Sequence, residues 1–600
     1  MMRFFGRLLS WLGGLVILGG LALLLFVMVA TRNKEVPART ILEVDLETDL
    51  VEDRPDDPLA QIAGMSKHDL RSLLAALERA QDDPRVIGLV ARIGQSKIGM
   101  AQVQELRDAV ARFRSKGKFA LAFSETFGEF TWGNSAYYLA TAFEQIWLQP
   151  SGDIGLTGVL LEPMFLKNVL EKVGVKPHLD QRYEYKNAMN MFTESKMTPA
   201  HREAMEKLAQ GWFGQLVRGI AEGRHLPEAD VRGLMDRGPF LGPETLKEKL
   251  VDQLGYRDEF YAKAKDRAGD GAQLLYLHKY LDRTERAAQK KLKGAKTVAL
   301  IYGLGGVHRG QSEFDALGGA PSMGSDTVTA AFRAAVADKD VKAIVFRIDS
   351  PGGSYVASDS IWREVVRARS AGKPVIATMG NVAGSGGYFV AMAADKIVAQ
   401  PGTITGSIGV LGGKYILTEL LDNKLGITHD RVVLGQNSTM WSTNQDFTPA
   451  EWARFQAWLD RVYQDFTAKV AEGRKLPKEK VLQVAKGRIW TGEDAKGLGL
   501  IDELGGLDTA LRLARQAIGA PDGEALQLKR FPERKKPAQA IAEKLMGKEP
   551  DNSEATSKSV QAATISVRAL SALRPLLRAL VEMSATDESA LEMTTVPELR

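Results

Sequence analysis

Residues 375–394, VIATMGNVAGSGGYFVAMAA, decide the expected fold of this chain. The stretch begins with an apolar run, Val375–Met379, passes through a glycine-rich turn around Ser385, and ends in the helix-like segment Tyr388–Ala394. A short apolar run that leads directly into a helix is typical of a buried strand in a parallel sheet. The sequence therefore places Ser385 on a turn between a strand and a helix.

The same pattern recurs on both sides of this stretch. Short β-branched runs predict strands at Thr297–Tyr302, Ala343–Ile348 and Lys396–Ala399. Amphipathic spacing predicts helices at Ile361–Ser370 and Ala450–Ala471. Alternation of this kind indicates an α/β core with mainly parallel strands.

Punctuating residues of the first half of the chain recur in the second half at a nearly constant spacing. The shift is 250 or 251 residues for Gln149-Pro150 with Gln400-Pro401, Thr198-Pro199 with Thr448-Pro449, and Gly242 with Gly492. Arg92-Ile93 matches Arg347-Ile348 at 255 residues, so a few residues differ between these landmarks. Self-similarity over this length predicts two copies of one whole domain.

The chain is accordingly divided into five segments. These are an N-terminal membrane anchor (1–40), a first repeat (41–280), a charged connector that can also be a helix (281–296), a second repeat (297–520) and a tail (521–600). Within the tail, the basic run Lys529–Lys536 is expected to be a flexible linker. Ile565–Met583 regains helical spacing and is expected to be a docking or membrane-surface helix.

Composition fits two globular domains and excludes several other classes of protein. The 600 residues are 44% hydrophobic and 26% charged, which is enough to bury two cores. The 79 basic and 74 acidic side chains leave a net charge of +5 spread along the chain, so no nucleic-acid partner is expected. The sequence has no cysteine, which excludes a disulfide framework and a thiol nucleophile.

The N-terminus predicts a membrane-spanning helix. Leu8–Thr31 carries no charge and is flanked by Arg7 and Arg32, and a span needs about 20 residues. A cleaved signal peptide is the alternative, but its apolar region is usually about 7–15 residues long. The bulky Met28 also does not fit the small-x-small motif that a cleavage site ending at Ala30 would need. Basic residues lie on both sides of the span, so charge alone does not fix its orientation.

Ser385 has the setting of a catalytic serine, although the turn Gly384–Gly387 alone also fits a tight turn with serine as filler. A second glycine turn, Asp349–Ser354, likewise follows a strand and precedes a helix. Where a helix begins with glycines, its first backbone N–H groups are not crowded by side chains. A developing oxyanion requires such exposed donors. The expected donors are the N–H of Gly386 and that of Gly352 or Gly353.

A serine nucleophile also needs a base. None of the seven histidines lies in a triad-like motif. The glycine-rich turn Gly303–Gly306 does not match a dinucleotide-binding fingerprint, because the third glycine of that fingerprint would fall at His308. No cofactor or metal site is predicted. A desolvated lysine is the other base that activates serine. Lys186 has apolar neighbours such as Met189 and Phe192, but most lysines are exposed, so spacing alone leaves this choice open.

Three motifs together resemble one family. Asp349–Ser354, Gly384–Tyr388 and Thr405–Val410 are similar to the long, duplicated form of signal peptide peptidase A, also called protease IV, the serine-lysine peptidases of family S49. The resemblance covers residues 8–518, including the anchor and both repeats. It implies two tandem crotonase/Clp-protease-like α/β domains with mainly parallel sheets.

The resemblance also assigns roles to residues. In the family the second repeat supplies the nucleophile, here Ser385, and the first supplies the lysine within Tyr-Lys-Ser-Ala. Tyr185–Ala188 matches that motif, with Lys186 as the base and Asn187 where the family often has serine. Ser407 corresponds to the hydroxyl that orients the lysine.

The resemblance finally implies a setting and a substrate. It suggests a homotetramer anchored in the inner membrane by a single span, with its catalytic domains on the periplasmic side, that hydrolyses peptides such as remnant signal peptides. Two alternatives stay open, namely a crotonase-like enzyme that binds acyl-CoA and a catalytically idle membrane scaffold.

Comparison of the repeats predicts a single site for each chain. At a shift of 251 residues Ser385 falls on Asn134, and Lys186 falls on Asn437. The Pro-Gly-Gly turn corresponds to 96–98 in the first repeat, which lacks the glycines. Each repeat therefore holds only part of the predicted site.

Overall fold

The computed structural model describes residues 35–54, 68–95, 98–312 and 321–533. The predicted anchor helix Leu8–Thr31 and the predicted helix Ile565–Met583 lie outside these ranges. Within the described residues, no helix combines the length and the apolar character that crossing a bilayer requires.

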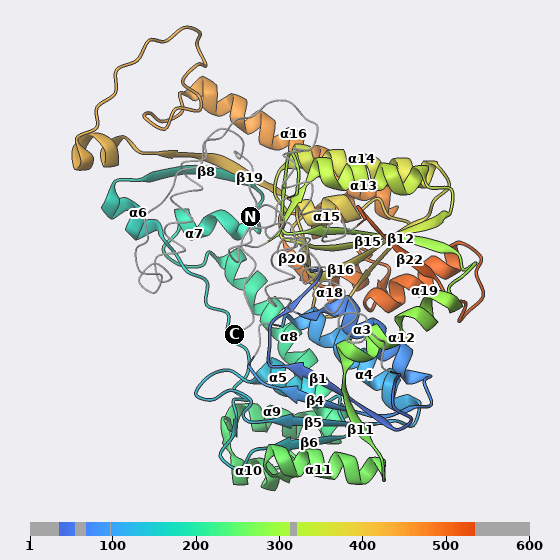
Figure 1. Cartoon of the computed structure of the whole chain (residues 1–600). Helices are drawn as coiled ribbons and strands as arrows, with labels where there is room; N and C mark the ends of the chain where they lie inside the picture. Colours follow the sequence, from blue (N-terminus) through green and yellow to red (C-terminus); the bar gives the residue numbers. More distant parts are fainter. Residues whose placement is uncertain (1–34, 55–67, 96–97, 313–320, 534–600) are drawn as a thin grey trace, which may run out of the picture.

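A fully parallel, six-stranded sheet forms the centre of the first repeat, which is the lower lobe in Figure 1. Alternate residues of its strands face two separate cores, as the two-residue period of a strand requires. Leu42 and Val44 point into a large core, whereas Ile41 points into a smaller one. In sheet order the strands are β10 (Gln253–Leu254), β6 (Gln145–Leu148), β5 (Phe119–Ser124), β4 (Val86–Ile93), β1 (Thr40–Leu46) and β11 (Gln273–Tyr276).

The second repeat repeats this arrangement in an eight-stranded sheet whose pairs are parallel except β18 with β20. Its main path is β20 (Ile489–Thr491), β18 (Ile404–Gly406), β16 (Val375–Gly384), β15 (Val341–Ser350), β12 (Thr297–Leu304) and β22 (Gln527–Phe531). Two further strands, β17 (Lys396–Ala399) and β21 (Glu503–Leu504), extend it beside β16. The predicted mixed α/β fold with mainly parallel sheets is confirmed.

Helices cover both sheets. Those of the first repeat include α3 (Leu70–Gln81), α4 (Met100–Ser115), α5 (Asn134–Ala140), α8 (Pro199–Arg224), α9 (Glu228–Arg237), α10 (Gly242–Lys247) and α11 (Arg257–Ala268). Those of the second repeat include α13 (Ser325–Ala337), α14 (Tyr355–Ser370), α15 (Gly386–Ala391), α16 (Pro449–Arg474), α17 (Lys478–Val484), α18 (Gly492–Leu498) and α19 (Leu507–Ala517).

The long helices α8 and α16 occupy equivalent places in the two repeats and begin in the same way. Thr198 accepts a hydrogen bond from the His201 N–H, and Thr448 accepts one from the Glu451 N–H. Each threonine precedes a proline at the first helical position, where a missing N–H costs nothing. The recurring Thr-Pro pair that revealed the duplication is therefore a helix start.

The structure resolves one alternative of the sequence-based division and differs from it in one other segment. The charged stretch after residue 281 continues a helix, α12 (Leu277–Lys291), which buries Leu277, Tyr280 and Thr284. Lys529 belongs to strand β22, although the sequence indicated a flexible linker there. Strand β22 lies at the edge of its sheet, where charged side chains are tolerated. Its Lys529 pairs with Asp338, and Arg530 pairs with Asp53.

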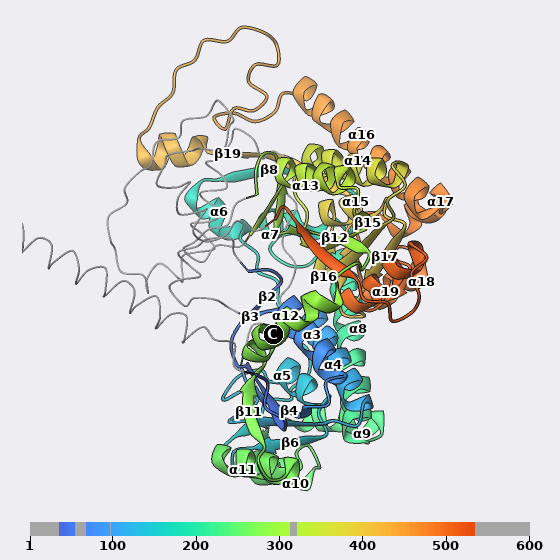
Figure 2. The same ribbon diagram turned by 45° about the vertical axis from the view of Figure 1, so that its right-hand side comes forward.

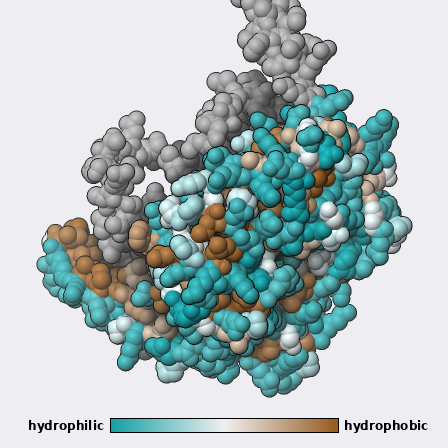
Figure 3. Space-filling model, turned by 90° about the horizontal axis from the view of Figure 1, so that it is seen from below, coloured by the Kyte–Doolittle hydropathy of each residue, from teal (hydrophilic) through white to brown (hydrophobic). Residues whose placement is uncertain are grey.

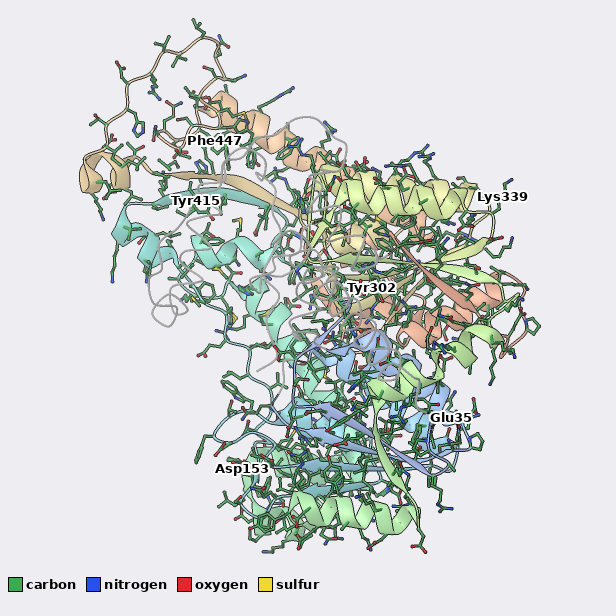
Figure 4. All side chains as sticks on the ribbon, in the orientation of Figure 1. Glu35, Asp153, Tyr302, Lys339, Tyr415 and Phe447 are labelled. Atoms are coloured by element: carbon green, nitrogen blue, oxygen red, sulfur yellow. The ribbon has the colours of Figure 1, made fainter. Side chains whose placement is uncertain are left out.

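An antiparallel ribbon joins the repeats and extends away from both sheets, as Figures 1 and 2 show. Strand β8 (Lys176–Arg182) of the first repeat pairs with β19 (Val410–Ile416) of the second, with Arg182 opposite Val410. We call this ribbon, together with α6 (Lys167–Val173), α7 (Asn190–Thr193) and residues 417–447, the arm. Tyr415 and Phe447 lie on it, far from Tyr302 between the lobes (Figure 4). The ribbon brings the chain before residue 187 next to the second repeat.

A buried charge cluster fastens the two repeats to each other. Arg347 on β15 donates to both carboxylate oxygens of Glu52, at 2.8 and 3.0 Å, and lies 2.6 Å from Glu105 on α4. All three side chains are buried. A buried guanidinium between two carboxylates is costly to break, because each partner left behind is an uncompensated charge.

Arg347→Ala is therefore expected to destabilise the folded protein by about 3–5 kcal/mol. The measurement is the midpoint and slope of urea unfolding followed by circular dichroism. The matched control is Arg333→Ala, which breaks an ion pair with Glu364 in which the arginine is half exposed, and whose loss costs about 1 kcal/mol or less. Equal effects of the two substitutions would contradict the role given to the cluster.

The surface seen from below is mostly hydrophilic, with apolar side chains gathered in a few patches (Figure 3). Several strongly exposed apolar residues belong to the arm. Leu425, Val432 and Leu434 are 59%, 94% and 86% exposed. Exposed apolar groups that lie close together are typical of surfaces that contact another molecule.

Candidate active site

Ser385 lies at the junction of β16 and α15, as the sequence predicted. Its backbone has φ 54° and ψ −112°, a conformation that residues other than glycine rarely adopt. Its N–H donates to the Gly406 carbonyl at 2.8 Å, which fixes the turn against β18. A strained strand-to-helix turn is the geometry that holds a serine nucleophile in other hydrolases.

Lys186 reaches Ser385 from the other repeat. It follows β8 and immediately precedes the 3-10 turn η1 (Asn187–Met189). Its Nζ lies 2.8 Å from the Ser385 Oγ, 2.9 Å from the Ser407 Oγ and 2.9 Å from the Ser407 carbonyl oxygen. The structure therefore brings together the three side chains that the sequence singled out.

The surroundings of Lys186 favour an uncharged amine. The side chain is 2% exposed, and burial lowers its pKa well below the usual value of a lysine. The three hydrogen-bond partners of Nζ found in the described residues are neutral oxygen atoms. A neutral amine has two hydrogens and one lone pair, so it can donate twice to Ser407 while it accepts the Ser385 hydroxyl proton.

Ser407 is held by the second repeat. It follows β18 with φ 50°, and its N–H donates to the Arg488 carbonyl at 2.7 Å. This places its hydroxyl and its carbonyl on the same amine. Ser407 therefore makes two contacts with the lysine amine.

The glycine turn after β15 packs directly on the serine. A Cβ atom at Gly352 would lie 2.8 Å from the Gly386 nitrogen and 2.9 Å from the Ser385 Cβ, so no side chain fits there. A Cβ atom at Gly386 would lie 3.1 Å from the Gly353 nitrogen. The backbone N–H groups of the two turns therefore converge beside Ser385.

The two candidate glycines of this turn differ in what their N–H groups contact. The Gly352 N–H donates to the Ser350 Oγ at 3.2 Å, and the Ser350 hydroxyl donates in turn to the Gly305 carbonyl. Among the described residues, no backbone partner is found for the Gly353 N–H. The geometry favours Gly353 over Gly352 as the donor that acts together with Gly386.

In the first repeat, the residue equivalent to Ser385 makes hydrogen bonds that stabilise a turn. Asn134, the counterpart of Ser385, begins α5, and its side-chain amide donates to the Gly158 carbonyl at 2.8 Å. Its side-chain oxygen accepts the Thr157 N–H at 3.2 Å. Asn437, the counterpart of Lys186, is exposed in the arm. The first repeat therefore uses this position to fix a turn.

Sequence reasoning missed the turn 486–488, which supports the lysine. The Lys486 carbonyl accepts the N–H groups of Tyr183 and Tyr185, and the Gly487 N–H donates to the Ile408 carbonyl. Gly487 lies against Lys186 so closely that a Cβ atom there would be 2.4 Å from the lysine Cβ. A single glycine between charged residues carries no signal in the sequence that separates it from an ordinary loop glycine.

Comparison with known proteins agrees with this geometry. The model of peptidase family S49 matches residues 131–270 and 367–520. A second comparison finds Protease 4 of Salmonella typhi, 30% identical over 465 residues, which are 75% of this chain and 72% of the relative. This chain belongs to peptidase family S49. As a member of that family it is a serine peptidase.

Two further relatives support the same assignment. The chloroplastic serine protease SPPA of Arabidopsis thaliana is 31% identical over 448 residues, which span 74% of this chain and 65% of the relative. Protease 4 of Haemophilus influenzae is 29% identical over 476 residues, which span 75% of this chain and 73% of the relative. The segments matched by the family model contain Lys186, Ser385 and Ser407.

Proposed function

We propose that this peptidase works through a serine-lysine dyad in which Ser385 is the nucleophile and Lys186 the general base. The observation that carries the proposal is the 2.8 Å contact between the Ser385 Oγ and the Nζ of a buried lysine. Ser407 orients the amine. The N–H groups of Gly386 and Gly353 bind the oxyanion.

The reaction follows from these positions. The Ser385 oxygen attacks the carbonyl carbon of the scissile bond while its proton passes to the neutral Lys186 amine. The carbonyl oxygen becomes an oxyanion between the two backbone N–H groups. The Lys186 ammonium then gives its proton to the leaving amine, and the carbon–nitrogen bond breaks to leave an ester on Ser385. Water attacks that ester with Lys186 again as the base, and the proton returns to Ser385.

Two alternative functions are distinguished from the peptidase by experiment. A crotonase-like enzyme that binds acyl-CoA would use the same glycine turns to polarise a thioester without a nucleophilic serine. A catalytically idle scaffold would need neither group. The contact between lysine and serine favours the peptidase, because burying an amine beside a hydroxyl costs stability and neither alternative uses it.

A serine-directed fluorophosphonate probe separates these functions. The proposal predicts that mass spectrometry finds a single label for each chain, on Ser385, and that Ser385→Ala is not labelled although its circular dichroism is unchanged. Binding of a CoA thioester without labelling would favour the acyl-CoA alternative. Undiminished labelling of Ser385→Ala would contradict the assigned nucleophile.

The proposed cellular role rests on the apolar N-terminal run and on the resemblance to the family. A single span at Leu8–Thr31 would hold the peptidase in the inner membrane with its catalytic repeats on the periplasmic side. There the site would be close to remnant signal peptides, which are extended, apolar and released in the bilayer. Protease digestion of intact and permeabilised cells tests the topology, since a periplasmic domain is not protected by the inner membrane.

The arm supports the proposed homotetramer. Its apolar residues Leu425, Val432 and Leu434 are strongly exposed in the single chain. Packing them against another copy would remove that surface from water. Light scattering of the detergent-solubilised protein gives the oligomer mass directly, and a monomer would contradict this part of the proposal.

A further inference from the structure

The segment that carries Lys186 is held by the turn 486–488 of the opposite repeat. The Lys486 carbonyl accepts the N–H groups of Tyr183 and Tyr185, at 3.4 and 3.1 Å. The Lys486 ammonium lies 2.9 Å from the Glu184 carboxylate. The position of the lysine therefore depends on this turn as well as on the β8–β19 ribbon.

Arg488, the last residue of this turn, packs on two aromatic rings. Its guanidinium carbon lies 4.8 Å from the centre of the Tyr185 ring and 4.5 Å from that of Trp490. It donates to Glu203 of α8 at 2.8 Å, and the Tyr185 hydroxyl donates to the same carboxylate at 2.6 Å. Tyr185, Glu203, Arg488 and Trp490 are named the Arg488 clamp below. Two members come from each repeat.

Three members of the clamp are next to a group of the site. Tyr185 directly precedes Lys186, and the Arg488 carbonyl accepts the Ser407 N–H. The Trp490 ring lies over the residue before Ser407, because a Cβ atom at Gly406 would be 2.9 Å from its Cδ1. The Arg488 side chain is 16% exposed and that of Glu203 is 56% exposed, whereas Lys186 is buried. The clamp is therefore partly exposed and adjoins the buried lysine through the chain at Tyr185.

We propose that Arg488 is a positioning residue, whose stacked and ion-paired guanidinium locks the Lys186 segment onto the Ser407 turn and keeps water away from the amine. The inference rests on the proposed dyad and adds to it the group that keeps the base dehydrated. A guanidinium suits this task because it stacks on aromatic faces while it pairs with a carboxylate.

The consequence for Lys186 follows from desolvation. Burial is the cause that lowers the pKa of this lysine, so water that enters beside it stabilises the ammonium and raises the pKa. Within the described residues, several titratable groups lie on the elements packed around Lys186 and Ser385. They include Tyr183, Glu184 and Tyr185 on the lysine segment, Lys486 and Arg488 on the turn, His201 and Glu203 on α8, Tyr463 on α16, and Asp349 at the start of the glycine turn.

The test is the pH dependence of the rate at which the fluorophosphonate probe labels Ser385 in the full-length protein. Labelling requires the neutral base, so its rate falls as the pH drops below the pKa of Lys186. In Arg488→Ala this fall is expected about one pH unit higher than in wild type, with near-normal rates recovered at still higher pH. Arg488→Lys keeps the charge but not the stacking and should show a smaller shift in the same direction.

Arg218→Ala is the matched control. It removes another ion pair between the repeats, from Arg218 on α8 to Glu493 on α18, in which both side chains are about half exposed. Its pH profile should match that of wild type. If Arg488→Ala and Arg488→Lys are folded and lose the same fraction of rate at every pH, Arg488 is only structural and the inference fails. If Lys186→Ala is labelled as fast as wild type, the dyad itself fails instead.

Discussion

Lys186→Met is expected to lower peptide hydrolysis by roughly 10²–10⁴-fold, which is the range for losing a general base. Methionine has nearly the length of lysine and fills the same buried space, but it cannot accept the Ser385 proton. The fold should survive, because the substitution also removes an amine that is costly to bury. The measurement is hydrolysis of casein or a fluorogenic peptide, with thermal unfolding recorded in parallel.

The control for this substitution is Lys118→Met. Lys118 is a partly buried lysine whose Nζ donates to three backbone carbonyls, those of Ala80, Asp83 and Val86. It lies in the first repeat and contacts no residue assigned to the site. Lys118→Met should lose stability but keep its kcat. Full activity in folded Lys186→Met would remove the lysine from the mechanism.

Gly487→Ala is the second substitution with a large expected effect. The new methyl group would be 2.4 Å from the Lys186 Cβ and 2.5 Å from its backbone nitrogen, so the lysine segment must move. A displacement of about 1 Å at a catalytic group can cost 10²-fold in rate. We therefore expect kcat/KM for a fluorogenic peptide to fall by about 10²-fold or more.

Gly372→Ala is the control that separates the effect of backbone strain from the effect of displacing Lys186. Gly487 has φ +80° and Gly372 has φ +78°, but no atom lies within 4 Å of a Cβ at Gly372. Both substitutions carry the same cost of a left-handed alanine, about 1–2 kcal/mol. Only Gly487→Ala should lose activity. Similar activity in the two variants would show that the contact with Lys186 does not matter.

The fold was largely predictable because its signals are local. The apolar run Val375–Met379 lies in β16, Lys396–Ala399 has the predicted strand bounds, and Ile361–Ser370 lies in α14. Each of these depends on residue types within one segment. Strand β22 was missed because Lys529 and Arg530 have the composition of a linker, and only pairing with β12 makes them a strand.

The site was only partly predictable for the same reason. The glycines around Ser385 indicated a functional turn, but the choice of Lys186 came from family resemblance, since spacing left it open. The structure adds the β8–β19 ribbon and the turn 486–488, which join residues about 230 and 300 positions apart. Contacts at such separation leave no periodic pattern. The preference for Gly353 over Gly352 likewise depends on a hydrogen bond to Ser350 that no motif shows.

One other group near the site complicates any measurement against pH. Burial, reinforced by the charge of Glu52, raises the pKa of Asp349, at the start of the glycine turn, to about 7. Its side chain accepts the Val382 N–H at 2.9 Å. Asp349→Asn keeps an oxygen for that bond and removes the ionisation, so it separates this group from Lys186.

The central claim is that a neutral amine from the first repeat activates a serine in the second, and the pH profile of Ser385 labelling tests it most directly. Wild type and Asp349→Asn should both show a rate that rises with pH and levels off above a pKa well below that of an ordinary lysine, about 10.4. Lys186→Met should lack this plateau and react far more slowly. A rate in Lys186→Met that equals wild type across the pH range would contradict the account.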